Sequence, residues 1–182
     1  MLEPMPSPFR EIAKLAALTL MRQGEIRTLR REMVHLEQGA ILLPQAKGGA
    51  RPVILNEAAR KILQAQLEAH DKAWVFPNPE GVPYSPVHVS RVFRKAARAA
   101  GLKDFHFHDL RHHGATMALN AGFTAPIVMP LGGWKTEKMM RRYAAVTDTT
   151  LRAAAEVVSG NAAWKWAANS APGLPNHAPS QV

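Results

Sequence analysis

The sequence contains no cysteine, so no disulfide framework can stabilise its fold. Long apolar runs are also absent. The longest, residues 15–21, includes Thr19 and is far shorter than the ~20 residues that a membrane helix needs. No signal peptide is visible either. These absences exclude a disulfide scaffold and a protein built on membrane helices, and they are compatible with a cytoplasmic location.

Acidic residues are scarce relative to basic ones. The chain of 182 residues carries 23 Lys and Arg against 14 Asp and Glu, a formal charge of +9. Such an excess favours a polyanionic partner such as nucleic acid, although a solvated basic surface would have the same composition. Because 47% of the residues are hydrophobic, we expect one globular domain with a real core.

Apolar periodicity divides the chain into helices and a few short strands. Helical spacing predicts a first helix opened by Ser7 and Pro8, apolar nearly all round and therefore buried. Alternating or β-branched segments predict three strands, at residues 34–36, 40–43 and 51–55. Further helices are predicted after residues 56 and 85, over 109–121, from 136, and over 151–158. We expect an unstructured lead (1–8), one domain (9–159) and a flexible tail (160–182).

Four histidines and one arginine lie within residues 105–114. A helix that begins near Asp109 and ends before Gly122 would place His108 and Arg111 on one face, because residues three apart are neighbours on a helix. Arginine offers a planar fork for phosphate, and histidine exchanges its proton near neutral pH. We therefore expect this pair to bind a phosphoryl group. A metal site is the alternative, but no cysteine accompanies the histidines, and zinc sites usually draw their ligands from wider spacings.

Other basic residues stand at positions where a role is plausible. Arg22 follows the apolar first helix and needs a partner, because an unpaired buried guanidinium is costly. That partner is Glu25, a bound phosphate, or both. Lys47 lies on the glycine-rich tip of the connection 44–50 and is either solvated or functional. A basic stripe that fits a DNA backbone runs along the helix after residue 85; it consists of Arg91, Arg94, Lys95 and Arg98.

Six residues in this order resemble the catalytic domain of the tyrosine recombinase, or phage integrase, family: Arg22, Lys47, His108, Arg111, Trp134 and Tyr143. The segment 19–25 resembles the first arginine box, Lys47 lies on the corresponding hairpin turn, and residues 108–112 match the second box. Leu-Gly-Gly-Trp134 with Arg-Tyr143-Ala matches the third. The likeness covers roughly residues 10–158. It implies an α+β, mainly helical fold, a bundle of helices with a small three-stranded antiparallel sheet.

The sequence departs from the family pattern at three positions. Leu20 stands where the family usually has glycine, Arg31 where tryptophan is frequent, and Pro130 interrupts the helix that leads into Leu-Gly-Gly-Trp134. We expect Leu20 to crowd the turn before Arg22 and Pro130 to bend the approach to Trp134. The resemblance also implies that the family's separate helical DNA-binding domain, and the first helix of its catalytic domain, are missing from this chain.

The six residue types allow a coherent chemistry. A tyrosine hydroxyl can attack a phosphodiester, and the phosphotyrosyl bond then stores the energy of the broken linkage. Arg22 and Arg111 would clamp the phosphate, supported by Glu25. His108 would move the tyrosine proton or support the phosphate, Lys47 would protonate the leaving oxygen, and Trp134 would pack the site. No metal, ATP or other cofactor is then needed.

The resemblance further implies a particular product and assembly. The product would be a 3′-phosphotyrosyl link to double-stranded DNA. The protein would be a monomer when free and a homotetramer on paired sites, with the last helix docked on a neighbouring protomer. Two other functions fit the same residues: a non-catalytic DNA-binding remnant of a prophage integrase, and a type IB topoisomerase-like enzyme that nicks and reseals without a specific site.

Overall fold

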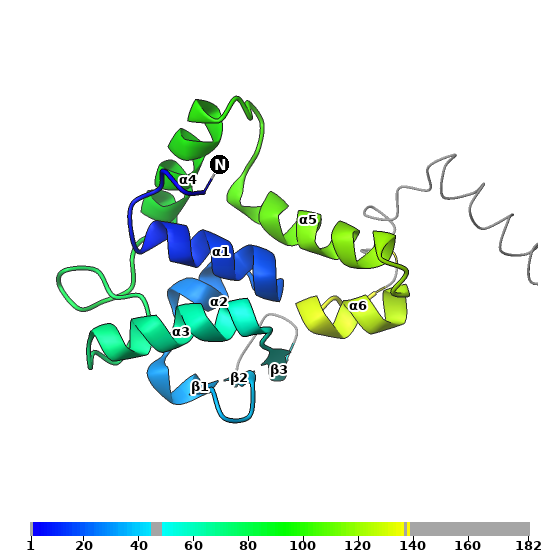
Figure 1. Cartoon of the computed structure of the whole chain (residues 1–182), viewed down its shortest axis with the longest axis horizontal. Helices are drawn as coiled ribbons and strands as arrows, with labels where there is room; N and C mark the ends of the chain where they lie inside the picture. The colour runs from blue at the N-terminus through cyan, green and yellow to red at the C-terminus, as the bar shows by residue number, and fades with distance from the viewer. Residues whose placement is uncertain (1, 45–48, 137, 139–182) are drawn as a thin grey trace, which may run out of the picture. The chain divides into compact units, whose positions relative to one another are not determined.

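The computed structural model describes residues 2–44, 49–136 and 138 (Figure 1). The predicted mainly helical α+β fold with one small sheet is confirmed. Within the described residues the elements are α1 (Phe9–Thr19), α2 (Gln23–Arg27), the short 3-10 helix η1 (Arg31–Met33), β1 (Val34–His35), β2 (Ala40–Leu43), β3 (Arg51–Ile54), α3 (Glu57–Ala69), α4 (Pro86–Ala99), α5 (Phe107–Asn120) and α6 (Ala125–Gly132).

Helix α1 is the centre of the bundle, with α2, α3, α4 and α5 all packed against it (Figure 1). Its side chains Ile12, Leu15 and Ala16 are fully buried, which confirms the predicted buried helix. The helix begins at Phe9, with Pro8 rather than Ser7 as its N-cap. The lead before it contributes Met5 to the core. The first helix and the chain before it are therefore fixed by burial of apolar surface.

The sheet has the predicted three strands in the order β1-β2-β3, all antiparallel. Ile41 pairs with Val53 and both are buried, whereas Leu42 and Ile54 are exposed on the other face. This alternation is the period of two expected for a sheet with one face on the core. The connection from β2 to β3 includes residues 45–48, which lie outside the described residues.

Helices α3 and α4 begin where the sequence predicts, because each has a polar N-cap. The Asn56 side chain accepts a hydrogen bond from the N–H of Ala59, and the Ser85 hydroxyl accepts one from the N–H of His88. Phe93 of α4 is buried, and its ring meets the ring of Phe107 edge-on at 5.3 Å. The inward face of α4 also carries Val89 and Ala97. Its other face is therefore free to carry charge.

Helix α5 begins at Phe107, two residues before the predicted start. The cause is Asp109, whose carboxylate accepts a hydrogen bond from the N–H of His106 at 2.6 Å and so closes the first turn earlier. The predicted end is confirmed, since Asn120 is the last helical residue and Gly122 follows with φ +92°.

The prediction that Pro130 interrupts a helix is wrong, because α6 continues through it to Gly132. A proline removes one backbone hydrogen bond, here the bond to the carbonyl four residues earlier. The end of α6 is closed by other donors: the N–H of Gly133 bonds the carbonyl of Pro130, and the N–H of Trp134 bonds that of Met129. These two bonds cap the carbonyl end of the helix directly after the proline.

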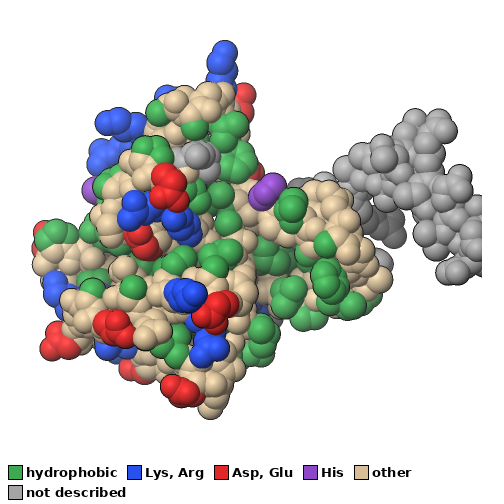
Figure 2. All heavy atoms as spheres, in the orientation of Figure 1, with side chains coloured by type: hydrophobic (Ala, Val, Ile, Leu, Met, Phe, Trp, Pro, Cys, Tyr) green, Lys and Arg blue, Asp and Glu red, His purple; other side chains and the backbone are tan. Residues whose placement is uncertain are grey.

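Apolar side chains gather on the surface over α6 (Figure 2). The exposed ones on α5, on α6 and between them are Met117, Phe123, Ile127 and Leu131. In the part of the chain that the structure describes, no helix combines the length and hydrophobicity needed to cross a membrane.

Candidate active site

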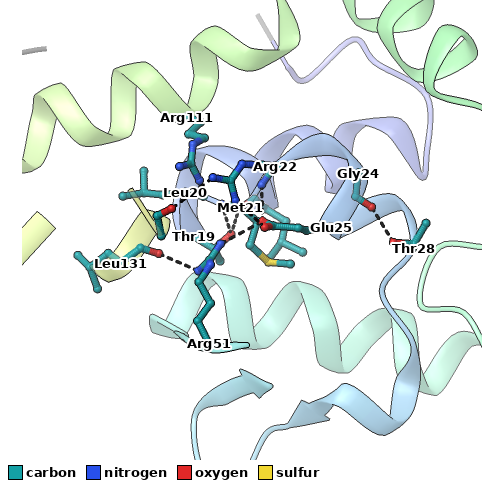
Figure 3. Close-up of polar contacts among 12 residues, drawn as sticks. Thr19, Leu20, Met21, Arg22, Gly24, Glu25, Thr28, Arg51, Arg111 and Leu131 are labelled. Carbon is teal, nitrogen blue, oxygen red and sulfur yellow. Dashed lines mark hydrogen bonds and ion pairs between the residues drawn. The ribbon is translucent and has the colours of Figure 1, made fainter. Parts of the chain in front are cut away.

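Arg22 stands at the N-cap of α2, directly after the chain leaves α1. Its backbone N–H donates to Oε2 of Glu25 at 2.8 Å, and its Nη1 donates to Oε1 at 2.9 Å. Its Nη2 reaches the carbonyl of Gly133 at 3.3 Å. Figure 3 shows the Arg22 side chain beside Glu25. The predicted pairing of Arg22 with Glu25 is thus confirmed. It leaves Arg22 tied both to its own helix and to the segment that ends α6.

Arg111 is buried in α5, with 2% of its surface exposed. Its Nη1 donates to the carbonyl of Leu20, and its guanidinium lies over the ring of Trp134, 3.9 Å from the ring centre. A guanidinium over an indole face is a favourable cation–π arrangement. Three segments far apart in the sequence therefore meet at this arginine: the end of α1, α5, and the residue after Gly133.

Leu20 adopts a left-handed conformation, with φ +57°, to end α1. A residue with a side chain pays roughly 1–2 kcal/mol for this conformation, which glycine adopts freely. The Leu20 side chain is buried beside Trp134 and Ala115. A Cβ added at Gly114 would overlap it. The expected crowding by Leu20 is therefore relieved on α5, where Gly114 leaves room.

The two glycines before Trp134 serve different purposes. A Cβ at Gly132 would overlap the indole ring of Trp134. Gly133 adopts φ +66°, and a Cβ there would lie 2.5 Å from Nε of Arg51. Substitution at either position would displace a ring or a guanidinium, so the Leu-Gly-Gly-Trp segment has a steric reason for both glycines.

Arg51 is a site residue that the sequence reasoning missed. Its Nη2 donates to Oε2 of Glu25 at 3.0 Å, and its Nη1 donates to the carbonyl of Leu131 at 3.2 Å. Burial lowers the pKa of Arg51 from its usual value, the charge of Glu25 opposes this effect, and the charge of Arg22 adds to it. One signal was available. In an alternating strand, Arg51 shares a face with Val53, which is buried.

His108 lies in the first turn of α5, at the edge of a pocket of about 360 Å³. Burial of part of the ring lowers the pKa of His108 below its usual value. The nearby charges of His112 and Arg111 lower it further. The rings of His108 and His112 lie edge to face, 4.4 Å apart. His108 is therefore held toward its neutral form, which can accept a proton.

The pocket brings His108 together with Arg22. We expected His108 and Arg111 to share an anion, but Arg111 is not among the residues that line this pocket. The remaining lining residues come from α2, α4 and the start of α5: Gln23, Gly24, Ser90, Arg94, His106 and Phe107.

All four residues of the predicted basic stripe are exposed on α4. They are Arg91, Arg94, Lys95 and Arg98. None of the ion pairs found among the described residues involves any of them. Arg94 also lines the pocket with Arg22 and His108, so the stripe reaches the candidate site.

Two members of the predicted set lie outside the described residues: Lys47 and Tyr143. The predicted helices after residue 136 and the predicted tail lie there too, apart from Lys138. Within the described ranges, no three His, Asp or Glu side chains are grouped as the ligands of a metal ion would be.

The sequence matches known proteins over most of its length. Residues 3–150 match the Phage integrase family. The chain is 30% identical to the integrase of Salmonella phage P22 over 158 residues, which cover 79% of this chain and 41% of that protein. It is 32% identical to the shufflon-specific DNA recombinase of Escherichia coli over 135 residues, 72% of this chain and 33% of that protein. The chain thus spans less than half the length of these two relatives.

Solved structures share the fold. The Tn1549 transposon integrase, in complex with transposon right end DNA, superposes with a TM-score of 0.72 at 17% identity, covering 82% of this chain and 58% of the other. The XerA recombinase superposes with a TM-score of 0.66 at 21% identity, covering 87% and 66%. The family match over residues 3–150 includes the arginine boxes and the Leu-Gly-Gly-Trp segment. The chain belongs to the phage integrase family.

Proposed function

We propose that this chain carries out site-specific DNA recombination by cutting and rejoining double-stranded DNA through a 3′-phosphotyrosyl intermediate. One observation carries the proposal. The guanidinium of Arg111 bonds the carbonyl of Leu20 and lies over the ring of Trp134. Arg22, two residues after Leu20, bonds the carbonyl of Gly133, directly before Trp134. Two arginines from distant segments are thus fixed beside one aromatic residue, as a phosphate clamp requires.

In this mechanism the hydroxyl oxygen of Tyr143 attacks the phosphorus as its proton passes to His108. The bond from phosphorus to the 5′ oxygen breaks, and that oxygen takes a proton from Lys47. Arg22 and Arg111 stabilise the negative charge on the non-bridging oxygens, and Trp134 packs against them. Attack by a 5′ hydroxyl on the phosphotyrosyl bond reverses each step and reseals the strand.

His108 suits its part because desolvation and nearby positive charge lower its pKa. A neutral imidazole accepts the tyrosine proton, whereas a charged one cannot. Arg22 and His108 line one pocket, which supports their action on the same phosphate. Glu25 supports Arg22 through two hydrogen bonds.

The partner in this proposal is double-stranded DNA, bound along α4 by Arg91, Arg94, Lys95 and Arg98. Their exposure, and the absence of ion-pair partners for them among the described residues, supports this assignment. The named relatives are phage and bacterial proteins, so we place the reaction in the cytoplasm of a bacterium. Residues 9–159 would form the catalytic domain, with 1–8 as its lead and 160–182 as a tail.

The proposed assembly is a monomer when free and a homotetramer on paired DNA sites. Its support is the exposed apolar surface of Met117, Phe123 and Ile127, which another protomer could cover. Deletion from Asp148 onward should then abolish recombination and leave cleavage of a nicked substrate intact. Unfolding of the shortened chain would instead assign the predicted last helix to its own core.

The test of the chemistry uses a half-site DNA nicked just beyond the scissile phosphate, so that the released fragment diffuses away. With EDTA present, the wild-type chain should form a DNA adduct that survives denaturing electrophoresis, and Tyr143→Phe should form none. An adduct in Tyr143→Phe, or one that requires magnesium, would contradict the proposal. If no adduct forms on authentic site DNA, the chain is a non-catalytic DNA-binding remnant. Relaxation of supercoiled DNA without a specific site would favour the topoisomerase-like reaction.

A further inference from the structure

Glu25 binds two arginines in a partly dehydrated setting. Its Oε1 accepts from Nη1 of Arg22, and its Oε2 accepts from both the backbone N–H of Arg22 and Nη2 of Arg51. The side chains of Glu25 and Arg51 are each only 10% exposed. Exposed ion pairs contribute little, but an ion pair removed from water matters, because loss of one partner leaves the other charge uncompensated.

The other half of the Arg51 guanidinium holds the end of α6. Its Nη1 donates to the carbonyl of Leu131 (Figure 3). The side chain also lies so close to Gly133 that a Cβ there would be 2.5 Å from Nε. Carbonyls in the last turn of a helix lack partners within the helix and favour a nearby cation. Arg51 therefore joins α2 to the segment that positions Trp134.

These interactions close a ring. Arg22 bonds Gly133, Glu25 bonds Arg22 and Arg51, and Arg51 bonds Leu131. The ring fixes the direction in which the Arg22 guanidinium points. The ring also fixes Gly133, the residue directly before Trp134. The indole of Trp134 in turn lies under the guanidinium of Arg111. Removal of Arg51 would open the ring at two of its links.

We propose that Arg51 is a positioning residue for DNA cleavage, acting through Glu25 and the end of α6 to hold Arg22 and Trp134 in place at the phosphate. This inference rests on the function proposed above. Arg51 spans two acceptors with the two ends of a planar fork, and lysine, with a single ammonium, cannot reproduce that geometry. A displacement of about 1 Å at a reacting centre can cost on the order of 100-fold in rate.

The test compares Arg51→Gln and Arg51→Lys with a matched control, Arg30→Gln. Arg30 also bonds a glutamate, Glu32, at 2.9 Å, but that pair is exposed. With saturating nicked half-site DNA, Arg51→Gln should form the adduct about 10- to 100-fold more slowly while DNA affinity is unchanged. Arg51→Lys should recover part of the rate. Arg30→Gln should match the wild-type chain.

A second measurement does not depend on activity. The indole N–H resonance of Trp134 should shift in Arg51→Gln and stay in place in Arg30→Gln. If that resonance shifts while the cleavage rate is unchanged, Arg51 is only structural and the inference fails. If the rate falls in parallel with thermal stability, and Arg51→Lys restores both together, the inference also fails.

A double-mutant comparison sharpens the test. Because Arg51 acts in part through Glu25 and in part through Leu131, the losses in Arg51→Gln and Glu25→Gln should be less than additive in the double mutant, and fully additive losses would overturn the inference. If the wild-type chain forms no adduct, the proposed function fails and the cleavage role of Arg51 falls with it. In that case the Trp134 resonance still decides whether Arg51 sets the position of Trp134.

Discussion

Two groups of basic residues among those that the structure describes differ in what surrounds them. Arg22, Arg51 and Arg111 lie where α1, β3, α5 and the end of α6 meet, and each is bonded to a carbonyl (Figure 3). The basic residues of α4 are exposed and make no ion pair among the described residues. The same functional group is thus held by hydrogen bonds in one region and solvated at the surface in the other.

This difference separates two roles that basic residues can have in one protein. A preorganised donor stabilises a transition state because it needs no reorganisation when charge develops. A solvated cation attracts any phosphate through long-range charge, and its effect is weakened by salt. The first group is suited to chemistry and the second to binding. Substitutions in each group can test that division.

The largest effect should follow from removal of a buried arginine. Arg111→Ala removes a transition-state donor, so adduct formation should slow by about 100- to 1000-fold. Arg98→Ala, from the exposed stripe, is the matched control and should leave the rate on saturating DNA unchanged. Rates would be measured from the adduct on nicked half-site DNA. Equal losses in both variants would abolish the distinction between the two groups.

Overpacking behind Arg111 should have the next largest effect. In Gly114→Ala the new Cβ would overlap the Leu20 side chain and lie 2.9 Å from the backbone carbonyl oxygen of Ala17. The carbonyl of Leu20 holds Arg111, and the free energy of unfolding should fall by about 1–3 kcal/mol. Gly24→Ala is the control. Gly24 also lies in a helix, but a Cβ there meets nothing within 4 Å, so stability should rise by up to about 1 kcal/mol. Urea unfolding would measure both changes, and a stable Gly114→Ala would show that both Leu20 and the backbone at Ala17 can move.

Neutralising the exposed stripe should act on binding alone. In Arg91→Gln and Lys95→Gln, the slope of log affinity against log salt should fall by about 0.9 for each phosphate that the variant no longer neutralises. The cleavage rate of fully bound DNA should not change. Titrations at several salt concentrations would measure the slope. A salt-independent affinity, or a slower rate at saturation, would place these residues in the chemistry.

The smallest effect concerns His108, at the boundary between the two regions. Its pKa is lowered, so the folded chain binds this proton less tightly than the unfolded chain does. The part of the free energy of unfolding that depends on neutral His108 is fully present above the pKa of the unfolded chain. It is lost as the pH falls toward the lower pKa of the folded chain. Adduct formation should therefore stay constant above the ordinary histidine pKa and decline only as the pH falls through the lowered pKa of His108.

His112→Gln tests the cause of the lowered pKa, because the charge of His112 is one of the effects that lower the pKa of His108. In this variant the pKa of His108 should rise toward its usual value, and the decline in rate should begin at higher pH. NMR titration of the imidazole protons would measure the pKa directly. A pKa of His108 above its usual value in the wild-type chain would contradict the sign of this prediction.

The elements set by local chemistry were predictable from sequence. Asn56 and Ser85 predict where α3 and α4 begin, because a polar N-cap acts within one turn of its helix. The sheet was predictable because its strands alternate and lie close together in the chain. The start of α5 and the continuity of α6 through Pro130 were not. In both places a capping hydrogen bond outweighed the general propensity.

The sequence by itself determined the family, the pairing of Arg22 with Glu25 and the candidates for the site. Motif spacing, and partners only a few residues apart, can be recognised without knowing how the chain folds. Only the tertiary structure decided which arginine lies where. Arg111 is buried with its guanidinium over the ring of Trp134. Arg51 bonds both Glu25 and the carbonyl of Leu131, and Leu131 lies 80 residues after Arg51 in the chain. Such contacts depend on how α1, α5 and α6 pack, and packing is fixed by burial of apolar surface summed over many residues rather than by any local pattern.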